Sequence, residues 1–210
     1  MNDADHAAAR RELVGALRRR LDVGEPTLSA VGAVPRHEFV PESHRGSAYA
    51  DRPLPIGRDQ TVSAPHMVAT MTDLLGVERG DRVFEVGTGC GYHAAVVTEV
   101  VGPGNVFSAE RVPELAADAR ARLDRLGYDV TVAVGDGREA FADRPPFDAA
   151  YLTCAAPEAV PDAIVDRVRP GGRVVAPVRE GGGQRLVRLT VREDGVDRED
   201  HGGVRFVPMR

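Results

Sequence analysis

A glycine-rich loop is the stretch of the sequence whose residue types and spacing point most directly to a ligand. Residues 85–92 read EVGTGCGY; they overlap the end of a short run at 82–86 that is rich in strand-forming residues, and they open a helical stretch at 92–101. Glycines between a strand and a helix let the backbone approach a bound nucleotide closely. The dinucleotide fingerprint would need a glycine where Tyr92 stands, and the chain has no GxxxxGK[ST] motif. A GxGxG loop preceded by Glu85 therefore favours S-adenosylmethionine (AdoMet) over NAD.

Two acidic residues follow the next two expected strands. Glu110 comes directly after the strand expected at 105–109, and Asp136, with Gly137 behind it, comes after the strand expected at 129–134. A carboxylate at the first position can accept hydrogen bonds from both hydroxyls of a ribose. One at the second position can accept a hydrogen bond from the amino group of adenine. Because the loop and both acids follow consecutive strands, together they predict an AdoMet-binding domain.

The elements that must position these residues alternate between strand and helix. This alternation predicts an α/β fold with a doubly wound, mostly parallel sheet of the Rossmann-like kind and a ligand at the carboxyl ends of its strands. Two terminal strands, at 186–192 and 204–208, should be antiparallel and joined by a turn at Asp194-Gly195. The other expected strands lie at 82–86, 105–109, 129–134, 149–153 and 173–178, and the helices at 64–75, 92–101, 113–126 and 158–168.

The first 63 residues are expected to form a helical extension in front of this core, within a single domain over 1–210. Apolar spacing predicts helices at 7–21 and 27–34. Residues 50–63 are expected to be irregular, because they contain two prolines and a glycine. We expect Ser63 to be the N-cap of the helix at 64–75, because Ser is a preferred capping residue and Pro is tolerated in a first turn.

Composition and charge exclude several classes of function. The net charge of −5 argues against a general nucleic-acid binder. The end of the fourth strand also lacks the Asn- or Asp-Pro-Pro-aromatic motif typical of enzymes that methylate nucleic-acid amino groups. Cys90 and Cys154 lie far apart and predict no zinc site or disulfide framework. With no signal peptide and no apolar run near ~20 residues, we expect a cytoplasmic monomer with no metal and no membrane or nucleic-acid partner.

Eight segments, spread in order over nearly the whole chain, carry a resemblance to one family. In them the chain resembles the protein-L-isoaspartate O-methyltransferases, repair enzymes that methylate the α-carboxyl of isoaspartyl residues in damaged proteins. The resemblance implies an AdoMet-dependent transferase that releases S-adenosylhomocysteine and acts on isoaspartyl proteins and peptides. The segments are VPRHEFVP (34–41), AYADRPLPIG (48–57), QTVSAPHMVATM (60–71), EVGTGCGY (85–92), GDG (135–137), AAP (155–157), RPGGRVVAPV (169–178) and VRFVPM (204–209).

The resemblance also implies three groups of site residues, carried over by position. Ser63 and Thr61 would lie at the catalytic centre. Substrate contacts would come from Asp59, Gln60, Val62, Val207 and Pro208. Cofactor contacts would come from Glu85, Gly87, Thr88, Gly89, Gly91, Tyr92, Glu110, Arg111, Asp136 and Gly137, with His66 near them in the first turn of a helix.

A carboxylate acceptor explains why hydroxyl groups can suffice at such a site. A carboxyl group has an unperturbed pKa of about 4 and is ionised at neutral pH, so the attack on a sulfonium methyl needs alignment and no general base. Thr61 and Ser63 can hydrogen-bond that carboxylate. His66 lies three residues beyond Ser63, but a nucleophilic serine has no evident role in a direct transfer.

Asp59 departs from the family pattern, in which glycine is common at this position. An acid ~6 Å from a carboxylate substrate would repel it by about 1–3 kcal/mol, unless Arg58 offsets the charge, so Asp59 could weaken or redirect recognition. Two alternatives therefore stay open. One is an AdoMet-dependent methyltransferase with a different carboxylate acceptor. The other is a non-catalytic AdoMet-binding paralogue that uses the loop at 58–63 for recognition.

Overall fold

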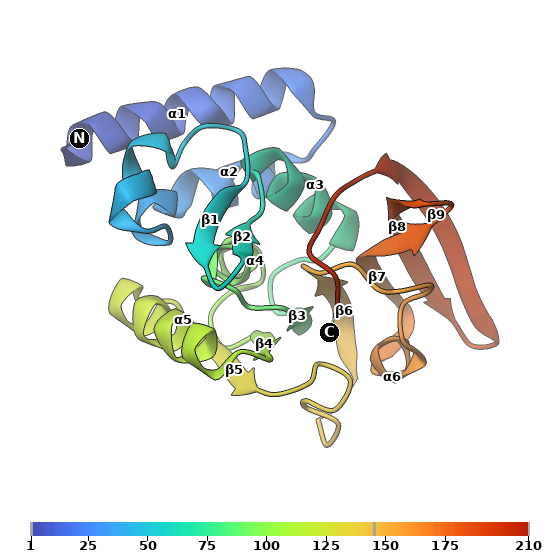
Figure 1. Cartoon of the computed structure of the whole chain (residues 1–210). Coiled ribbons are helices and arrows are strands. Elements are labelled where there is room, and N and C mark those ends of the chain that lie inside the picture. The colour runs from blue at the N-terminus through green and yellow to red at the C-terminus, as the bar shows by residue number, and fades with distance from the viewer. Residues whose placement is uncertain (1, 145, 210) are drawn as a thin grey trace.

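A seven-stranded mixed sheet forms the centre of the fold (Figure 1). The computed structural model describes residues 2–144 and 146–209. The strands are β3 (Val83–Val86), β4 (Val106–Glu110), β5 (Val130–Val134), β6 (Phe147–Leu152), β7 (Val168–Glu180), β8 (Gly183–Arg192) and β9 (Gly195–Gly203). Their order is β5-β4-β3-β6-β7-β8-β9; β3 to β7 are parallel, and β8 and β9 each run antiparallel to the strand before. This confirms the predicted doubly wound sheet with antiparallel C-terminal strands.

Helices pack on both faces of this sheet. The helices are α1 (Asp3–Arg20), α2 (Glu25–Ala33), α3 (Pro65–Leu75), α4 (Tyr92–Val101), α5 (Pro113–Leu126) and α6 (Asp162–Val165), with short 3₁₀ helices η1 (Arg36–Glu38) and η2 (Glu42–Ser47). On one face, Met71 of α3, Ala94 of α4 and Val106 of β4 belong to one buried apolar cluster. On the other face, Phe107 of the same strand belongs to a second cluster with Ile164 of α6.

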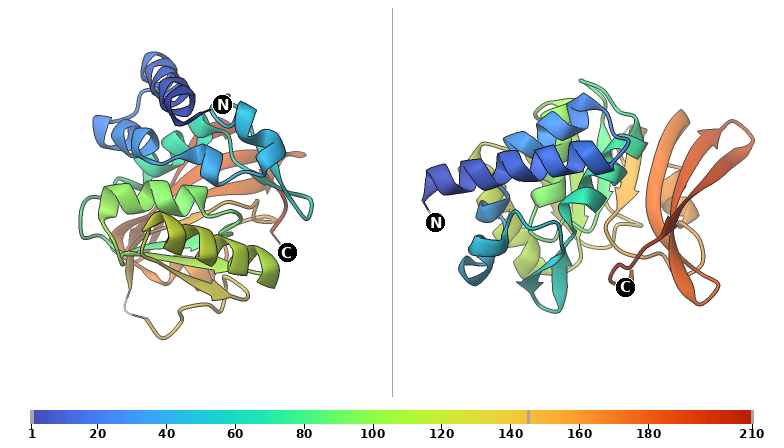
Figure 2. Two further views of the ribbon diagram at one scale, coloured as in Figure 1. Left: turned by 90° about the vertical axis from the view of Figure 1, so that its left-hand side faces the viewer. Right: turned by 90° about the horizontal axis from the view of Figure 1, so that it is seen from above.

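The N-terminal helices add a further layer beyond α3 and α4, as the two views in Figure 2 show. Asn2 caps α1, because its side chain accepts a hydrogen bond from the Asp5 amide at 2.9 Å. Leu17 of α1 and Val31 of α2 are buried in one cluster with Val96 of α4. No helix within the described residues is long and apolar enough to cross a membrane.

A small hairpin occupies part of the segment that was expected to be irregular. β1 (Leu54–Gly57) pairs antiparallel with β2 (Gln60–Val62). The prediction for 50–63 is therefore wrong over these residues. Pro55 is compatible with β1 because a two-stranded ribbon has only edge strands, where a missing amide donor is tolerated.

The helix expected at 158–168 is much shorter than predicted. α6 spans only Asp162–Val165, and β7 already begins at Val168. Pro161 starts the helix, and the Phe147 amide donates to the carbonyl of Arg167 at 2.7 Å, which draws the chain into the sheet. Tertiary strand pairing therefore overrides the helical spacing here.

The last strand was expected in the wrong place. The partner of β8 is the charged segment 195–203, whereas residues 204–207 belong to no strand. β9 is exposed along its length and is held by side-chain ion pairs with β8, such as Arg188–Glu199 at 2.6 Å. A strand exposed on both faces has no apolar alternation, so periodicity could not find it.

Candidate active site

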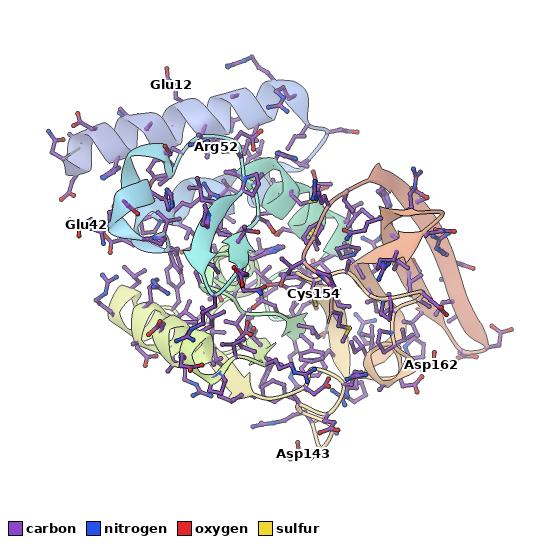
Figure 3. All side chains as sticks on the ribbon, viewed as in Figure 1. Glu12, Glu42, Arg52, Asp143, Cys154 and Asp162 are labelled. Carbon is purple, nitrogen blue, oxygen red and sulfur yellow. The ribbon has the colours of Figure 1, made fainter. Side chains whose placement is uncertain are left out.

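A cavity opens where β3, β4, β5 and β6 end. It is lined by the hairpin β1–β2, the glycine-rich loop, the residues that follow these strands and the C-terminal segment. Figure 3 places the labelled Cys154, one of the lining residues, between the hairpin and the ends of the strands. The cavity therefore lies at the position that the strand–helix alternation predicted for a ligand.

Most of the predicted site residues meet at this cavity. Those that line it are Gln60, Thr61, Val62, Ser63, Gly87, Thr88, Gly89, Tyr92, Glu110, Arg111, Asp136, Gly137, Val207 and Pro208. Four others, namely Asp59, His66, Glu85 and Gly91, lie outside the lining. Direct contact of these four with a ligand is therefore not supported by the geometry, and each has a different place in the structure.

The glycine-rich loop is held open by the backbone conformation of its glycines. Gly87 and Gly89 have φ values of 100° and 55°, which L side chains rarely adopt. A Cβ on Gly87 would lie 2.3 Å from the Thr153 hydroxyl, which donates to the Gly87 carbonyl at 2.5 Å. Gly91 serves the packing of α4, since a Cβ there would meet Leu123 of α5 at 3.1 Å. The first two glycines therefore leave backbone facing the cavity.

Glu110 is fixed at the end of β4 by two backbone amides. Its Oε2 accepts from the Gly89 amide at 2.9 Å, and its Oε1 accepts from the Val112 amide at 3.0 Å. Each carboxylate oxygen retains a second lone pair, and the side chain lines the cavity. The geometry is thus compatible with the predicted acceptance of ribose hydroxyls.

Asp136, which lies just after β5, is strongly ionised. Arg138 donates to both of its oxygens, with the closest contact at 2.5 Å, and these bonds hold the pKa of Asp136 at about 2. The carboxylate therefore stays ionised at any pH at which the protein would work and can accept from an amino group.

Glu85 lies fully buried behind the glycine-rich loop. Burial, with a smaller contribution from the charge of Glu110, raises its pKa to about 8, against the opposing effect of hydrogen bonds from Ser108 and Tyr151. Ser108 also bonds to the Thr88 hydroxyl at 2.5 Å. Glu85 therefore supports the loop through Ser108 and Thr88, which corrects the expectation that it contacts the cofactor itself.

The hydroxyls of Thr61 and Ser63 are available for a ligand. Both residues line the cavity, and the described part of the chain holds no hydrogen bond to either hydroxyl. Ser63 does not cap α3: the cap position is Ala64, and the capping carboxylate is Asp51, whose Oδ1 accepts from the His66 amide at 2.9 Å. The capping prediction is therefore wrong, because a more distant acid takes the role.

His66 is also occupied by Asp51. Its Nδ1 lies 2.8 Å from the same Asp51 oxygen, and Arg20 pairs with the second oxygen at 2.8 Å. Burial and these bonds act in opposite directions, and the bonds prevail, so the pKa of Asp51 lies below its usual range. Among the described residues His66 makes no contact with the Ser63 hydroxyl, and no Ser–His pair is formed.

Asp59 lies at the tip of the hairpin β1–β2. Arg58 and Asp59 are the two central residues of the turn, with φ values of 52° and 56°. Both are exposed, and Arg58 reaches Glu114 at the start of α5 at 3.6 Å. Asp59 thus lies on the outside of the hairpin, in a conformation for which Gly, Asn and Asp are the preferred residues.

Several lining residues were not predicted. They are Ile56, Val68, Val86, Cys90, His93, Ala109, Val112, Gly135, Thr153, Cys154 and Met209. Thr153 and Cys154 follow β6 and could have been found by the strand-end argument that found Glu110. Burial raises the pKa of the Cys154 thiol to about 12 and lowers that of His93 to about 3. Neither side chain is therefore charged, and the described residues hold no cluster of three or more metal-ligand side chains.

Comparisons with known sequences give one consistent result. The model of the family described as protein-L-isoaspartate(D-aspartate) O-methyltransferase matches residues 8–210. The chain is 49% identical over 209 residues to protein-L-isoaspartate O-methyltransferase 2 of Archaeoglobus fulgidus, covering 98% of this chain and 94% of the relative. It is 52% identical over 180 residues to the protein-L-isoaspartate O-methyltransferase of Methanopyrus kandleri, covering 84% and 79%.

Solved structures agree with this result. A protein-L-isoaspartate O-methyltransferase superposes with a TM-score of 0.85 at 27% identity, covering 95% of this chain and 65% of that longer chain. A Plasmodium falciparum protein, solved in complex with S-adenosyl-L-homocysteine, superposes with a TM-score of 0.82 at 23% identity, covering 96% and 98%. At that identity the second structure establishes the shared fold.

Proposed function

The chain belongs to the protein-L-isoaspartate(D-aspartate) O-methyltransferase family, and on that premise we propose that it methylates the α-carboxylate of isoaspartyl residues in damaged proteins. The enzyme uses AdoMet and releases S-adenosylhomocysteine. One observation carries the proposal for the site: Thr61 and Ser63, whose hydroxyls make no hydrogen bond within the described residues, line the same cavity as Glu110 and Asp136. The donor and acceptor sites thus share one space.

The residues on the sheet side of the cavity fit AdoMet. The backbone of Gly87 and Gly89 would hold the aminoacyl part, the Glu110 carboxylate would accept the ribose hydroxyls, and the ionised Asp136 would accept from the adenine amino group. Both glycines line the cavity with positive φ values, so their backbone can approach a ligand without an intervening side chain. AdoMet, as co-substrate, supplies a methyl group on a positively charged sulfur.

The residues on the hairpin side orient the acceptor. The substrate carboxylate is already ionised at neutral pH. Hydrogen bonds from Thr61 and Ser63 would fix its direction while leaving a lone pair to form the new O–C bond. An ionised acceptor needs no general base, and neither histidine would serve as one: His66 is engaged by Asp51, and a pKa of about 3 makes His93 a poor proton acceptor. Catalysis would then come from proximity and orientation.

A different carboxylate acceptor was suggested by Asp59 alone. Its side chain is exposed and lies outside the cavity lining. The structure therefore offers no feature that favours the alternative acceptor over an isoaspartyl residue.

Substitution of the two hydroxyls tests the proposed site. Thr61→Val and Ser63→Ala should each lower kcat/KM for an isoaspartyl peptide roughly 10- to 100-fold, because a hydrogen bond to a charged group contributes about 1.5–3 kcal/mol. The AdoMet Kd from calorimetry should stay within about twofold.

Matched controls for these variants are Thr131→Val on β5 and Ser29→Ala on α2. Both residues are exposed and lie outside the cavity lining, so kcat/KM should stay at the wild-type value. Wild-type rates in Thr61→Val and Ser63→Ala would remove the basis for the proposed acceptor site.

We further propose that the enzyme acts as a cytoplasmic monomer on protein acceptors and not on nucleic acid. Two features support this: both cysteines are free, as a reducing compartment would keep them, and the net charge is −5. Light scattering behind size-exclusion chromatography would measure the oligomeric state, and a dimer mass would contradict the monomer.

A further inference from the structure

The last described segment of the chain, residues 204–209, returns from the sheet to the cavity. We call it the C-terminal strap. In Figure 1 it leaves β9 and runs back to the end marked C, beside the end of β6. Val207, Pro208 and Met209 line the cavity, although residues 204–207 belong to no regular strand. Something other than strand pairing must therefore hold the strap in place.

One side chain on β8 makes a matched pair of bonds to the strap backbone. The Gln184 Nε2 donates to the Phe206 carbonyl at 3.0 Å, and the Gln184 Oε1 accepts from the Phe206 amide at 2.6 Å. The backbone carbonyl of Gln184 also accepts from the Val204 amide at 2.9 Å. The side-chain amide thus replaces a strand residue: it offers one donor and one acceptor, and only one of its two orientations satisfies both.

A second anchor lies on the other side of Val207. The Ala155 amide donates to the Val207 carbonyl at 2.8 Å, and the Met209 amide donates to the Ala155 carbonyl at 2.8 Å. The stretch that lines the cavity is therefore fixed by Ala155 behind β6 and by Gln184 on β8. Gln184 itself does not line the cavity and would act only through the strap.

We propose that Gln184 is a positioning residue for the acceptor peptide: it holds the strap so that Val207 and Pro208 form one wall of the acceptor site. The inference rests on the proposed function, in which this wall contacts the isoaspartyl peptide. Glu110 and Asp136, which would hold the cofactor, make their hydrogen bonds to other residues. Loss of Gln184 should therefore affect the acceptor and leave AdoMet binding intact.

The first test compares Gln184→Ala with the wild type and with Arg185→Gln. Removal of two hydrogen bonds should raise the KM for an isoaspartyl peptide about 5- to 30-fold, with kcat and the AdoMet Kd within about twofold. Arg185 is the matched control, because it is the next residue on β8 and its side chain pairs with Asp200 on the outside of β9 at 2.8 Å. Its variant should keep the wild-type KM.

A second variant separates positioning from simple loss of bulk. Gln184→Glu keeps the acceptor for the Phe206 amide but, when ionised, places a negative charge against the Phe206 carbonyl. With an ordinary pKa of about 4.3, this carboxyl stays mostly ionised between pH 5 and pH 8, so the KM of Gln184→Glu should rise at least as much as that of Gln184→Ala throughout this range. The defect of Gln184→Ala should be the same across this range.

Amide hydrogen exchange tests whether Gln184 holds the strap, and it needs no acceptor peptide. The Phe206 amide should exchange faster in Gln184→Ala than in the wild type or in Arg185→Gln. Equal exchange, or an AdoMet Kd that rises as much as the peptide KM, would overturn the inference. An unchanged peptide KM in an active Gln184→Ala enzyme would overturn it and leave the proposed function standing, whereas a wild type that methylates no isoaspartyl peptide would overturn the proposed function.

Discussion

Glu85 supports the AdoMet loop as a neutral acid. It has no cationic partner in the described structure, and both of its oxygens face hydroxyl groups, those of Ser108 and Tyr151. With a pKa of about 8, it carries its proton at neutral pH in the folded state. An uncharged side chain under the loop avoids repulsion with the ionised groups that line the cavity.

This protonation makes the stability of the fold depend on pH. The pKa of Glu85 is raised from 4.5 to about 8, so the folded state keeps a proton that the unfolded state releases. The contribution of the bound proton to the free energy of unfolding is fully present below pH 4.5. It is lost as the pH rises to about 8, and the loss is on the order of 3–5 kcal/mol. In Glu85→Gln, which mimics the protonated acid, this loss should be absent when urea unfolding is measured at pH 5 and pH 8.

Comparing the wild type with Glu85→Gln isolates the contribution of Glu85 to the pH dependence of unfolding. Other groups that titrate in this range, such as His37, are present in both and cancel in the difference. If the wild type and Glu85→Gln lost the same free energy of unfolding between pH 5 and pH 8, Glu85 would not be the protonated acid described above.

Asp59 should matter for the turn more than for the substrate. Its left-handed conformation is easy for Gly, tolerable for Asp and costly for a β-branched residue, by roughly 1–2 kcal/mol. Asp59→Gly should therefore keep the free energy of unfolding within about 1 kcal/mol, whereas Asp59→Val should lose about 1–2 kcal/mol.

Activity gives the second readout for Asp59. Because the side chain lies outside the cavity, Asp59→Gly should change kcat/KM for an isoaspartyl peptide by less than about threefold. A tenfold increase would show instead that the acid repels the substrate, as the sequence alone suggested.

The sequence predicted the positions of some site residues but not of others. Glu110 and Asp136 were predictable because each lies at or just after the end of a strand, and the ends of parallel strands meet. Their hydrogen-bond partners could not be predicted. Arg138 reaches Asp136, and the Gly89 amide reaches Glu110, only through the geometry of a side chain and of a loop. The expected cap at Ser63 failed for the same reason: Asp51 comes from another segment.

At the scale of elements, one buried arginine joins the N-terminal extension to the catalytic loop. The Arg36 guanidinium donates to the carbonyls of Ala48, Arg52 and Ser63, and it lies 5.5 Å from the centre of the Tyr92 ring. The side chain is fully buried, and burial lowers its pKa. It therefore ties η1, the segment before β1 and the end of the hairpin together.

Removal of this arginine should destabilise the fold and loosen the loop. In Arg36→Met, three carbonyls lose a donor, so the free energy of unfolding should fall by about 2–5 kcal/mol in a urea titration. Arg36→Lys should lie in between, because an ammonium keeps the charge but not the planar set of donors. The control Arg192→Met loses a half-exposed pair with Asp197 and should cost less than about 1 kcal/mol. An Arg36→Met protein as stable as this control would contradict the role.

The elements with a buried apolar face were predictable from the sequence. Helices 92–101 and 113–126 match α4 and α5, because their apolar residues recur at helical spacing and pack on the sheet. β9 was missed because its charged residues have no buried face, and the helix at 158–168 was overestimated because strand pairing at Val168 ended it.

At the scale of the whole molecule, three distant parts of the chain meet at one cavity. The sheet core supplies the AdoMet side, the hairpin before α3 supplies the hydroxyls, and the C-terminal strap supplies a third wall. Strand–helix alternation predicted the first part. The meeting of the other two could be inferred only from the family resemblance, because nothing in local periodicity links residues 60–63 to residues 207–209. A division of one domain at residue 63 stays a prediction.

The most direct test of this account is a competition between two acceptors in one reaction. An equimolar mixture of two peptides of the same sequence, one with aspartate and one with isoaspartate, would be incubated with the enzyme and labelled AdoMet. The account predicts a methyl ester on the isoaspartyl peptide alone. Equal labelling of both peptides, or no labelling while calorimetry still detects AdoMet binding, would contradict it.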